Sequence, residues 1–479
     1  MLYVISKKFQ KNLKYIFLNK MFTFVGVKTE NMLLKVEKRW VIAFIITVIV
    51  AMVSLFWPTQ LPVASSGVFL EENNLVGADI AWLLASSGLV LLMTPGLSFF
   101  YGGMVGKKNI ISTMLQSFIA LGVISLVWVV VGFSLSFGDS LGFYIGKEHY
   151  GIIGNPFSFT FFNQVGVLPH SKMAPTVPFI LFALFQMKFA VITPAIITGS
   201  FAERVRFVSY LLFIVLFSLF IYAPLAHMVW SGDGFLVKFF GIKDFAGGTV
   251  VHMSAGFAAL AGALMIGKRK NDHHEPSNIT YVILGTGMLW FGWFGFNSGS
   301  ALAANATAAM AFGTTTISSA SAMMTWIFFD RINGRKISAL GACIGAVVGL
   351  VAITPACGYV SIAESIFIGF ISAIVSNMAV NWKKLKSVDD TLDVFACHGI
   401  GGIMGMILTA IFARGENASL LHGGVGVFAH HMTALLLVSV FTFFGALVIY
   451  KITDFIIPLR VEETSEELGL DISQHNESI

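Results

Sequence analysis

The feature that most constrains this chain is a succession of long apolar segments separated by short polar loops. Hydrophobic residues make up 56% of its 479 residues and charged residues only 11%, and the mean hydropathy is +0.82. A soluble domain carries about 25% charged residues, whereas an apolar run of about 20 residues is long enough to cross a bilayer as a helix. The sequence therefore predicts an all-α protein that crosses the membrane many times.

Eleven predicted spans make up a transmembrane domain over residues 77–456, which is followed by a tail over residues 457–479. Their cores are residues 80–104, 110–137, 176–200, 207–230, 247–267, 279–298, 303–329, 338–355, 361–381, 394–413 and 426–450. The 47 glycines suit this arrangement, because small residues let helix backbones approach one another in lipid.

Residues 1–66 are predicted to be a basic extension and a cleaved signal peptide. Nine lysines and arginines fall in the first 40 residues, residues 40–57 are apolar, and the small residues Ala64, Ser65 and Ser66 follow. That order is typical of a secretory leader. A leader that starts at Met32 has ordinary proportions, so residues 1–31 are expected to be an over-extended start. An uncleaved anchor helix is the alternative.

Basic residues are divided unevenly between alternate loops. One set of loops holds thirteen Lys and Arg residues and the other set holds five. Because loops rich in Lys and Arg face the cytoplasm, we expect the N-terminus of the eleven-span domain outside and the tail inside. Lys188 is the one basic residue inside a predicted span. Whether it faces a pathway or snorkels toward the outer interface is left open.

Two histidines lie inside apolar runs, each eight residues after an aspartate. Asp244 precedes His252 in the fifth span, and Asp390 precedes His398 in the tenth. Spans five apart run in opposite directions, so the spacing predicts a five-plus-five inverted repeat with a site near the midplane. Ionisable groups in a membrane are costly and usually functional. We expect the histidines to meet and line a pathway, with core histidines bonded to carbonyls as the alternative, and both aspartates to cap their helices.

Aromatic residues gather with hydroxyl groups in the same part of the chain. Phe185 and Phe189 lie one helical turn apart, Trp230 ends a span, and residues 290–300 combine Trp and Phe with Asn and Ser. A cation against an aromatic face gains about 0.5–2 kcal/mol, but a dehydrated metal cation needs several oxygen ligands, and the spans hold almost no carboxylates. The pathway suits a small cation that can lose a proton and cross as a neutral molecule, as ammonium can.

At these residues the chain resembles the ammonium transporter (Amt/Mep/Rh) family. The resemblance runs from about Asp79 to Asn476, and DFAGGTVVH over residues 244–252 matches the family signature. The motif AHMVW precedes it, and GWFGFNSGS and VDDTLDVFACHG come after it, in the family's order. The resemblance implies a homotrimer of eleven-helix protomers, each with its own pore, and Trp230 favours the Amt branch.

The resemblance also implies roles for individual residues. It implies an external ammonium site at Trp230, Ser300 and Phe189, with Asp244 needed for recruitment. It implies a gate formed by Phe189, Phe296 and Phe185. Beyond the gate it implies a pore lined by His252, His398 and Trp293. The implied mechanism deprotonates bound ammonium, conducts ammonia along the histidines and carries the proton separately. Whether the net species is NH3 or NH4+ is left open.

No enzymatic activity, cofactor, metal site or nucleic-acid partner is expected. Cys343, Cys357 and Cys397 lie in apolar runs without metal-ligand spacing. The resemblance implies a multi-pass protein of a bacterial plasma (inner) membrane, with a cytoplasmic surface like the one that binds PII-type signal proteins. An ammonium sensor of the same fold, signalling through its tail or a partner, is the alternative function.

Overall fold

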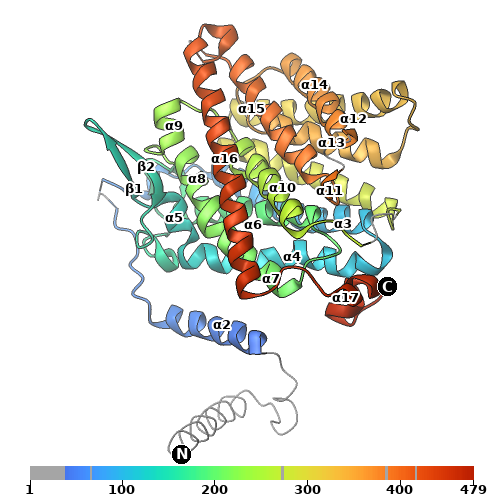
Figure 1. Cartoon of the computed structure of the whole chain (residues 1–479). Helices are drawn as coiled ribbons and strands as arrows, with labels where there is room; N and C mark the ends of the chain where they lie inside the picture. Colours follow the sequence, from blue (N-terminus) through green and yellow to red (C-terminus); the bar gives the residue numbers. More distant parts are fainter. Residues whose placement is uncertain (1–37, 65–66, 271–274, 383–386, 416–417) are drawn as a thin grey trace, which may run out of the picture. The chain divides into compact units, whose positions relative to one another are not determined.

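The computed structural model describes residues 38–479 except 65–66, 271–274, 383–386 and 416–417 (Figure 1). The chain divides into two units, Met1–Pro58 and Thr59–Ile479. The first unit contains the apolar helix α2 (Lys38–Phe56), which covers most of the predicted leader or anchor segment. The proposed over-extended start, residues 1–31, lies outside the described residues.

The second unit has a helix at each of the eleven predicted positions. In chain order these helices are α3 (Gly77–Met104); α4 (Ile110–Val127), continued by the π-helical turn η3 (Trp128–Gly132) and α5 (Phe133–Phe137); α6 (Phe179–Ile197); α7 (Phe207–Phe217), continued by η6 (Ser218–Tyr222) and α8 (Ala223–Trp230); η7 (Gly248–Met253) with α10 (Ser254–Ile266); α11 (Ile279–Ser298); α12 (Ala306–Ile332); α13 (Ala339–Ile353); α14 (Ile362–Asn381); η10 (Phe395–Ile400) with α15 (Gly401–Phe412); and α16 (Val425–Ile456). The predicted helical class is confirmed.

Length and composition alone single out nine of the helices in the described part of the chain as able to cross a membrane. The two predicted spans outside that set are α12 and α13. Helix α12 has 27 residues but is rich in Ala, Ser and Thr, and α13 has only 15 residues. They pack closely against each other, because a Cβ on Gly349 would lie 2.6 Å from the Ser318 carbonyl oxygen.

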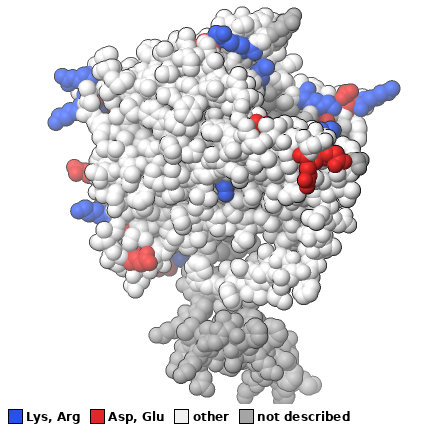
Figure 2. All heavy atoms as spheres, turned by 180° about the vertical axis from the view of Figure 1, so that it is seen from behind, with Lys and Arg blue, Asp and Glu red and all other residues white. Residues whose placement is uncertain are grey.

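The face of the second unit shown in Figure 2 is largely uncharged, with Lys, Arg, Asp and Glu gathered mostly toward its edges. Large apolar side chains are exposed on several helices, among them Phe220, Phe291 and Phe444, which are 60%, 55% and 59% exposed. Such a surface is favourable in lipid and costly in water. Together with the long apolar helices, it indicates a multi-pass membrane protein.

The tail packs against helix ends on one side of the second unit, which we call the tail face. It contains α17 (Glu463–Leu468) and the π-helical turn η12 (Asp471–His475). The Asp471 carboxylate accepts hydrogen bonds from the backbone N–H groups of Ile111 and Ser112, at 3.1 and 2.7 Å. The Gln474 side chain accepts one from Phe207 N–H at 2.7 Å. The tail thus caps the first turns of α4 and α7, whose N–H groups have no partner within their own helices.

The opposite ends of several helices carry loops with short strands that the sequence did not predict. Strand β1 (Ser140–Ile145) pairs antiparallel with β2 (Glu148–Gly154), and β3 (Pro169–His170) pairs with β4 (Ala174–Pro178). The short helix α9 (Phe235–Phe240) lies in the same region. These loops form the rim of a cleft, and we call this side the vestibule face.

Candidate functional site

The two histidines predicted to meet are in contact, buried inside the helical unit. His252 lies in η7 and His398 in η10, and their Nδ1 atoms are 3.3 Å apart. The two residues are 0% and 5% exposed. Facing glycines allow the approach, because a Cβ on Gly256 would lie only 2.2 Å from the backbone nitrogen of Gly399. The predicted contact is confirmed.

A hydrogen bond between two Nδ1 atoms fixes the tautomers of the pair. A neutral imidazole has one N–H donor and one bare nitrogen. If one ring donates its Nδ1–H to the other, its own Nε2 is an acceptor and the partner's Nε2 carries a hydrogen. The Nε2 atom of His252 is buried and has no hydrogen-bond partner among the described residues. The pair can therefore offer one donor and one acceptor to a small molecule.

A narrow internal cavity of about 10 Å³ runs beside the histidine rings. Apart from the histidines and Trp293 its walls are wholly apolar, and they are formed by Met93, Leu97, Phe100, Ile192, Ile196, Val251, Leu289, Phe296 and Val347. That volume is about the space of one water-sized molecule. An ion would lose its hydration there without gaining ligands, whereas a small neutral molecule would lose much less.

Aromatic rings continue from the histidines toward the vestibule face. The ring of His252 stacks on Trp293 at 5.3 Å between centroids and on Phe296 at 5.9 Å. The Trp293 Nε1–H donates to the hydroxyl of Thr354 at 2.9 Å, which fixes the indole. The Phe296 ring lies 4.3 Å from that of Phe189. Both phenylalanines are at most 1% exposed, so they separate the histidines from the cleft beyond.

That cleft has a volume of about 870 Å³ and opens on the vestibule face. Phe189, Trp230 and Ser300 line it, together with the carboxylates of Asp139 and Asp233. The centroid of Trp230 lies 5.9 Å from that of Phe189, with the rings nearly perpendicular. Ser300 donates its hydroxyl hydrogen to the Phe296 carbonyl at 2.8 Å, which leaves its oxygen lone pairs free to accept a hydrogen bond from a cation.

Asp244 lies behind this cleft and is not among its lining residues. Its carboxylate accepts hydrogen bonds from the N–H groups of Gly247, Gly248 and Thr249 at 2.6–2.8 Å, and from the Thr249 hydroxyl. Its carbonyl accepts the Nε1–H of Trp230 at 3.1 Å. The predicted cap is confirmed, and it also holds the indole that faces the cleft.

Comparison with known proteins agrees with this geometry. Residues 81–479 match the family model described as Ammonium Transporter Family. The chain belongs to the ammonium transporter family. It is 42% identical over 422 residues to the ammonium transporter of Aquifex aeolicus, an alignment that covers 87% of this chain and 96% of the relative.

Solved structures of ammonium transporter relatives have the same fold. Mep2 of Saccharomyces cerevisiae superposes with a TM-score of 0.76 at 31% identity, covering 87% of this chain and 95% of that one. A protein described as Sensor Amt Protein superposes with a TM-score of 0.76 at 29% identity, covering 85% of this chain and all of that one. The family is one of transporters rather than enzymes.

Most of the residues predicted for the ammonium site, the gate and the pore form one series of contacts in this family member. The rings of Trp230, Phe189, Phe296, His252 and His398 follow one another at centroid distances of 4.3–5.9 Å. The buried Phe185 ring packs edge-on against Phe189 at 5.0 Å. Asp244 stands apart from the series, since it reaches the cleft only through Trp230.

Other polar residues near the site lie where the sequence did not indicate. Gln186 lines the cleft, and its Oε1 atom is buried without a hydrogen-bond partner in the described structure. Asn297 and Ser298, grouped with the aromatics by sequence, instead donate to Thr315 and Ala308 in α12. Lys188 does not line the cleft. The sequence did hold a signal for Gln186. Residues 185 and 186 lie about one helical turn before Phe189, so they share the face of the helix that carries Phe189.

Proposed function

We propose that this protein transports ammonium across a membrane by recruiting NH4+ in the vestibule cleft and conducting ammonia past the paired histidines. The observation that carries the proposal is the change of surroundings along the series of rings. The cleft offers two carboxylates, an indole and a free hydroxyl lone pair, all favourable to a cation. The cavity beyond Phe296 offers apolar walls and two imidazoles, so the ion must become neutral in passing.

The paired histidines then serve ammonia rather than ammonium. Ammonia has one lone pair and three N–H groups, so it can accept from one Nε2–H and donate to the other, bare Nε2. Potassium and sodium ions can lose no proton and find no oxygen ligands in the narrow cavity. The proton removed from ammonium travels separately. Phe189 and Phe296, with Phe185 beside them, act as the gate between the cleft and the cavity.

The orientation and the assembly are part of the same proposal. The vestibule face lies outside and the tail face inside a bacterial plasma membrane, with the Asp244–His252 and Asp390–His398 segments as halves of an inverted repeat. Residues 1–66 are removed as an extension and leader, 77–456 span the membrane, and 457–479 form the cytoplasmic tail. Protomers assemble as homotrimers, and the tail face binds a PII-type protein. N-terminal sequencing of the mature protein tests the leader, and native mass spectrometry tests the trimer.

The proposal is tested by current on purified protein in liposomes adsorbed to a solid-supported membrane. Pulses of ammonium should give a saturable current, and equal pulses of sodium or potassium should give none. Empty liposomes supply the background. Equal currents for ammonium and potassium would contradict the mechanism, because they would require a pathway that accepts a cation that cannot be deprotonated.

An ammonium sensor is the second candidate, favoured by the likeness to the Sensor Amt Protein over the whole of that chain. In a sensor, ammonium binds in the cleft and changes the tail face without passing the histidines. Ammonium-dependent quenching of tryptophan fluorescence with no current would support sensing, whereas current together with binding supports transport.

A further inference from the structure

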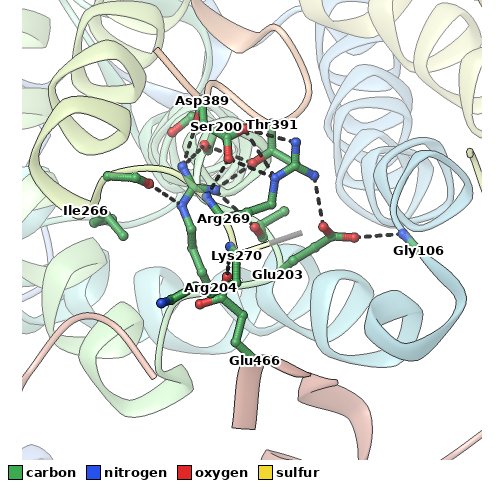
Figure 3. Close-up of polar contacts among 12 residues, drawn as sticks. Gly106, Ser200, Glu203, Arg204, Ile266, Arg269, Lys270, Asp389, Thr391 and Glu466 are labelled. Atoms are coloured by element: carbon green, nitrogen blue, oxygen red, sulfur yellow. Dashed lines mark hydrogen bonds and ion pairs between the residues drawn. The ribbon is translucent and has the colours of Figure 1, made fainter. Parts of the chain in front are cut away.

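Two adjacent carboxylates at the tail-face end of η10 have very different surroundings. Asp389 is fully paired, because both of its oxygens accept hydrogen bonds from the Arg269 guanidinium at 2.9–3.2 Å, and one also accepts from Arg269 N–H at 2.8 Å. Arg269 reaches Glu203 as well, at 2.9 Å (Figure 3). The Arg269 cation is thus fully occupied by Asp389 and Glu203.

The nearby Arg204 is also occupied. Its guanidinium donates to the carbonyls of Ser200, Ala202, Gly267 and Asp389 and to the hydroxyl of Thr391, at 2.5–3.2 Å (Figure 3). None of these bonds reaches the carboxylate of Asp390. Arg204 therefore acts as a fixed brace between the loop over residues 200–206 and the start of η10.

Asp390 is left with half of its hydrogen-bonding capacity unused. Its Oδ2 atom accepts from Phe395 N–H at 2.7 Å, which confirms the predicted cap of η10. Its Oδ1 atom is buried and has no hydrogen-bond partner among the described residues, although the residue as a whole is only half-buried. An ionised carboxylate oxygen without donors is unfavourable away from water, whereas a proton on that oxygen removes the charge.

In the described part of the chain, five groups face Asp390, and together they do not hold it ionised. They are Arg204, Asp389, Tyr101 of α3, Cys397 of η10 and Tyr450 of α16. Burial raises the pKa of Asp390, the Phe395 and Val394 N–H groups and Arg204 oppose that rise, and Asp389 adds to it, so that the pKa of Asp390 is about 6. The carboxyl therefore changes its protonation state within the range of pH in which a membrane transporter works.

We propose that Asp390 Oδ1 is a proton-binding site at the tail-face end of the pore, which takes up and releases the proton separated from ammonium. This proposal rests on the proposed function, which requires a separate carrier for that proton. Ammonium dissociates to ammonia and a proton; the carboxylate of Asp390 gains a proton to become the acid and later loses it to the solution at the tail face. No bond of the protein is otherwise made or broken.

The position of Asp390 suits this role better than that of Asp244. Asp390 begins the helical segment that carries His398, eight residues further on, and the residue is partly exposed near the tail face although its Oδ1 atom is buried. Asp244 occupies the matching position before His252, but both of its oxygens are saturated by donors. Only one of the two aspartates thus has an oxygen free for a proton.

The protonation state of the Asp390 carboxyl is measured by infrared difference spectroscopy on the purified protein in lipid. In the wild type, part of the carbonyl stretch of protonated carboxylic acids should disappear as the pH rises through about 6, and that part should be missing in Asp390→Asn, while the part from ordinary carboxyl groups, which disappears near about pH 4, remains. Asp244→Asn is the matched control, because it removes the other helix-capping aspartate and should leave the titrating band of Asp390 in place. Asp390→Glu keeps a carboxyl and should keep a titrating band, which guards against a folding defect. An Asp390→Asn spectrum identical to the wild type would overturn the proposal.

Transport separates a failure of this proposal from a failure of the proposed function. Between pH 5 and 8 the wild-type ammonium current should vary with pH, and in Asp390→Asn it should fall by at least about tenfold and lose that variation. If the wild type carries current and Asp390→Asn carries the same current at each pH, the proton site is wrong and the transport function stands. If the wild type itself carries no ammonium current, the transport function is wrong whatever the infrared band does.

Discussion

The helical segments that carry the two histidines begin in the same way and differ in what their first aspartate does. Ahead of η7, both carboxylate oxygens of Asp244 accept hydrogen bonds from N–H groups of the first turn, and its carbonyl accepts one from Trp230. Ahead of η10, one carboxylate oxygen of Asp390 accepts a hydrogen bond from the first turn, and the other has no partner among the described residues. The same spacing thus supplies a rigid support for the cleft at one end and an unsaturated carboxyl at the other. Equal spacing in sequence does not imply equal chemistry.

The strongest test of what the two segments share is removal of either histidine. We expect His252→Ala and His398→Ala each to abolish electrogenic, ammonium-selective transport, a loss of at least about 100-fold, because the remaining imidazole has no partner to fix its tautomer. Current on a solid-supported membrane measures it, with sodium and potassium pulses as the selectivity check. A wild-type current in either variant would contradict a pathway shared by both histidines.

The contact between the two segments can be broken without touching a histidine. In Gly256→Ala the new Cβ would lie 2.2 Å from Gly399 N, so the backbones must separate and the 3.3 Å contact between the rings must lengthen. We expect a loss of current of about 10- to 100-fold, the cost of roughly 1 Å of misplacement. Gly401→Ala is the matched control, since its nearest neighbour would be a Val351 side-chain methyl at 3.2 Å. Equal currents in the two variants would mean that the close approach is unimportant.

The difference between the aspartates should appear in stability. Asp244→Ala leaves three backbone N–H groups without their acceptor, and we expect a loss of about 3 kcal/mol or more. Asp390→Ala removes one such bond and should cost only about 1 kcal/mol, the ordinary value of a cap. Thermal unfolding in detergent measures both. Equal losses would argue against the contrast drawn here between a saturated and a half-used cap.

At the vestibule end, two residues of the same helix should behave differently toward ammonium. Gln186 has a buried, unpaired Oε1 in the wall of the cleft, and one hydrogen bond lost in Gln186→Leu should raise the half-saturating ammonium concentration about three- to tenfold. Lys188 lies outside the cleft wall, so Lys188→Met should leave that concentration unchanged. A large effect of Lys188→Met would place its charge near the cation after all.

The smallest expected effect concerns how the stability of the protein depends on pH. The contributions of the neighbours Asp389 and Asp390 to that stability should change with pH in opposite directions. Burial raises the pKa of Asp389, but Arg269 more than offsets this and lowers it overall, so its stabilisation is present above about pH 4 and is lost as the pH falls through the folded value. The pKa of Asp390 is raised to about 6, so the folded state binds the extra proton and stability declines as the pH rises from about 4 to 6.

Asp390→Asn should therefore flatten the decline between about pH 4 and 6, by on the order of 1 kcal/mol. Arg269→Gln should instead weaken the protein most above about pH 4 and least in acid. Unfolding temperatures measured across this range in detergent test both slopes. A steeper decline for Asp390→Asn would have the wrong sign and would refute the raised pKa.

Much of the fold and of the ring series could be predicted from sequence, for identifiable reasons. The eleven helices follow from apolar runs, which depend only on local composition. The meeting of His252 and His398 follows from the cost of isolated ionisable groups in lipid. The caps at Asp244 and Asp390 are local contacts, formed within five residues of the aspartate. Local contacts and strong penalties are what a single sequence records best.

What could not be predicted depends on contacts between distant segments. Thr354 fixes Trp293 across 61 residues of sequence, and Asn297 turns away from the aromatics to bond Thr315. The unsaturated oxygen of Asp390 arises because Arg204 and Arg269 are both used by other partners. No spacing rule reveals which of several possible acceptors an arginine selects.

The Nδ1 contact between the histidines gives the pair two unlike ends. One hydrogen lies between two nitrogens 3.3 Å apart, so one ring ends in a bare Nε2 and the other ends in an Nε2–H. These roles exchange only if an Nε2 proton moves as well, because displacing the shared hydrogen alone would leave one ring positive and the other negative. A molecule that both donates and accepts can satisfy both ends, whereas a species with only one of these capacities satisfies one ring. The pair thus selects for two-sided hydrogen bonding, in addition to the selection by size and charge in the apolar cavity.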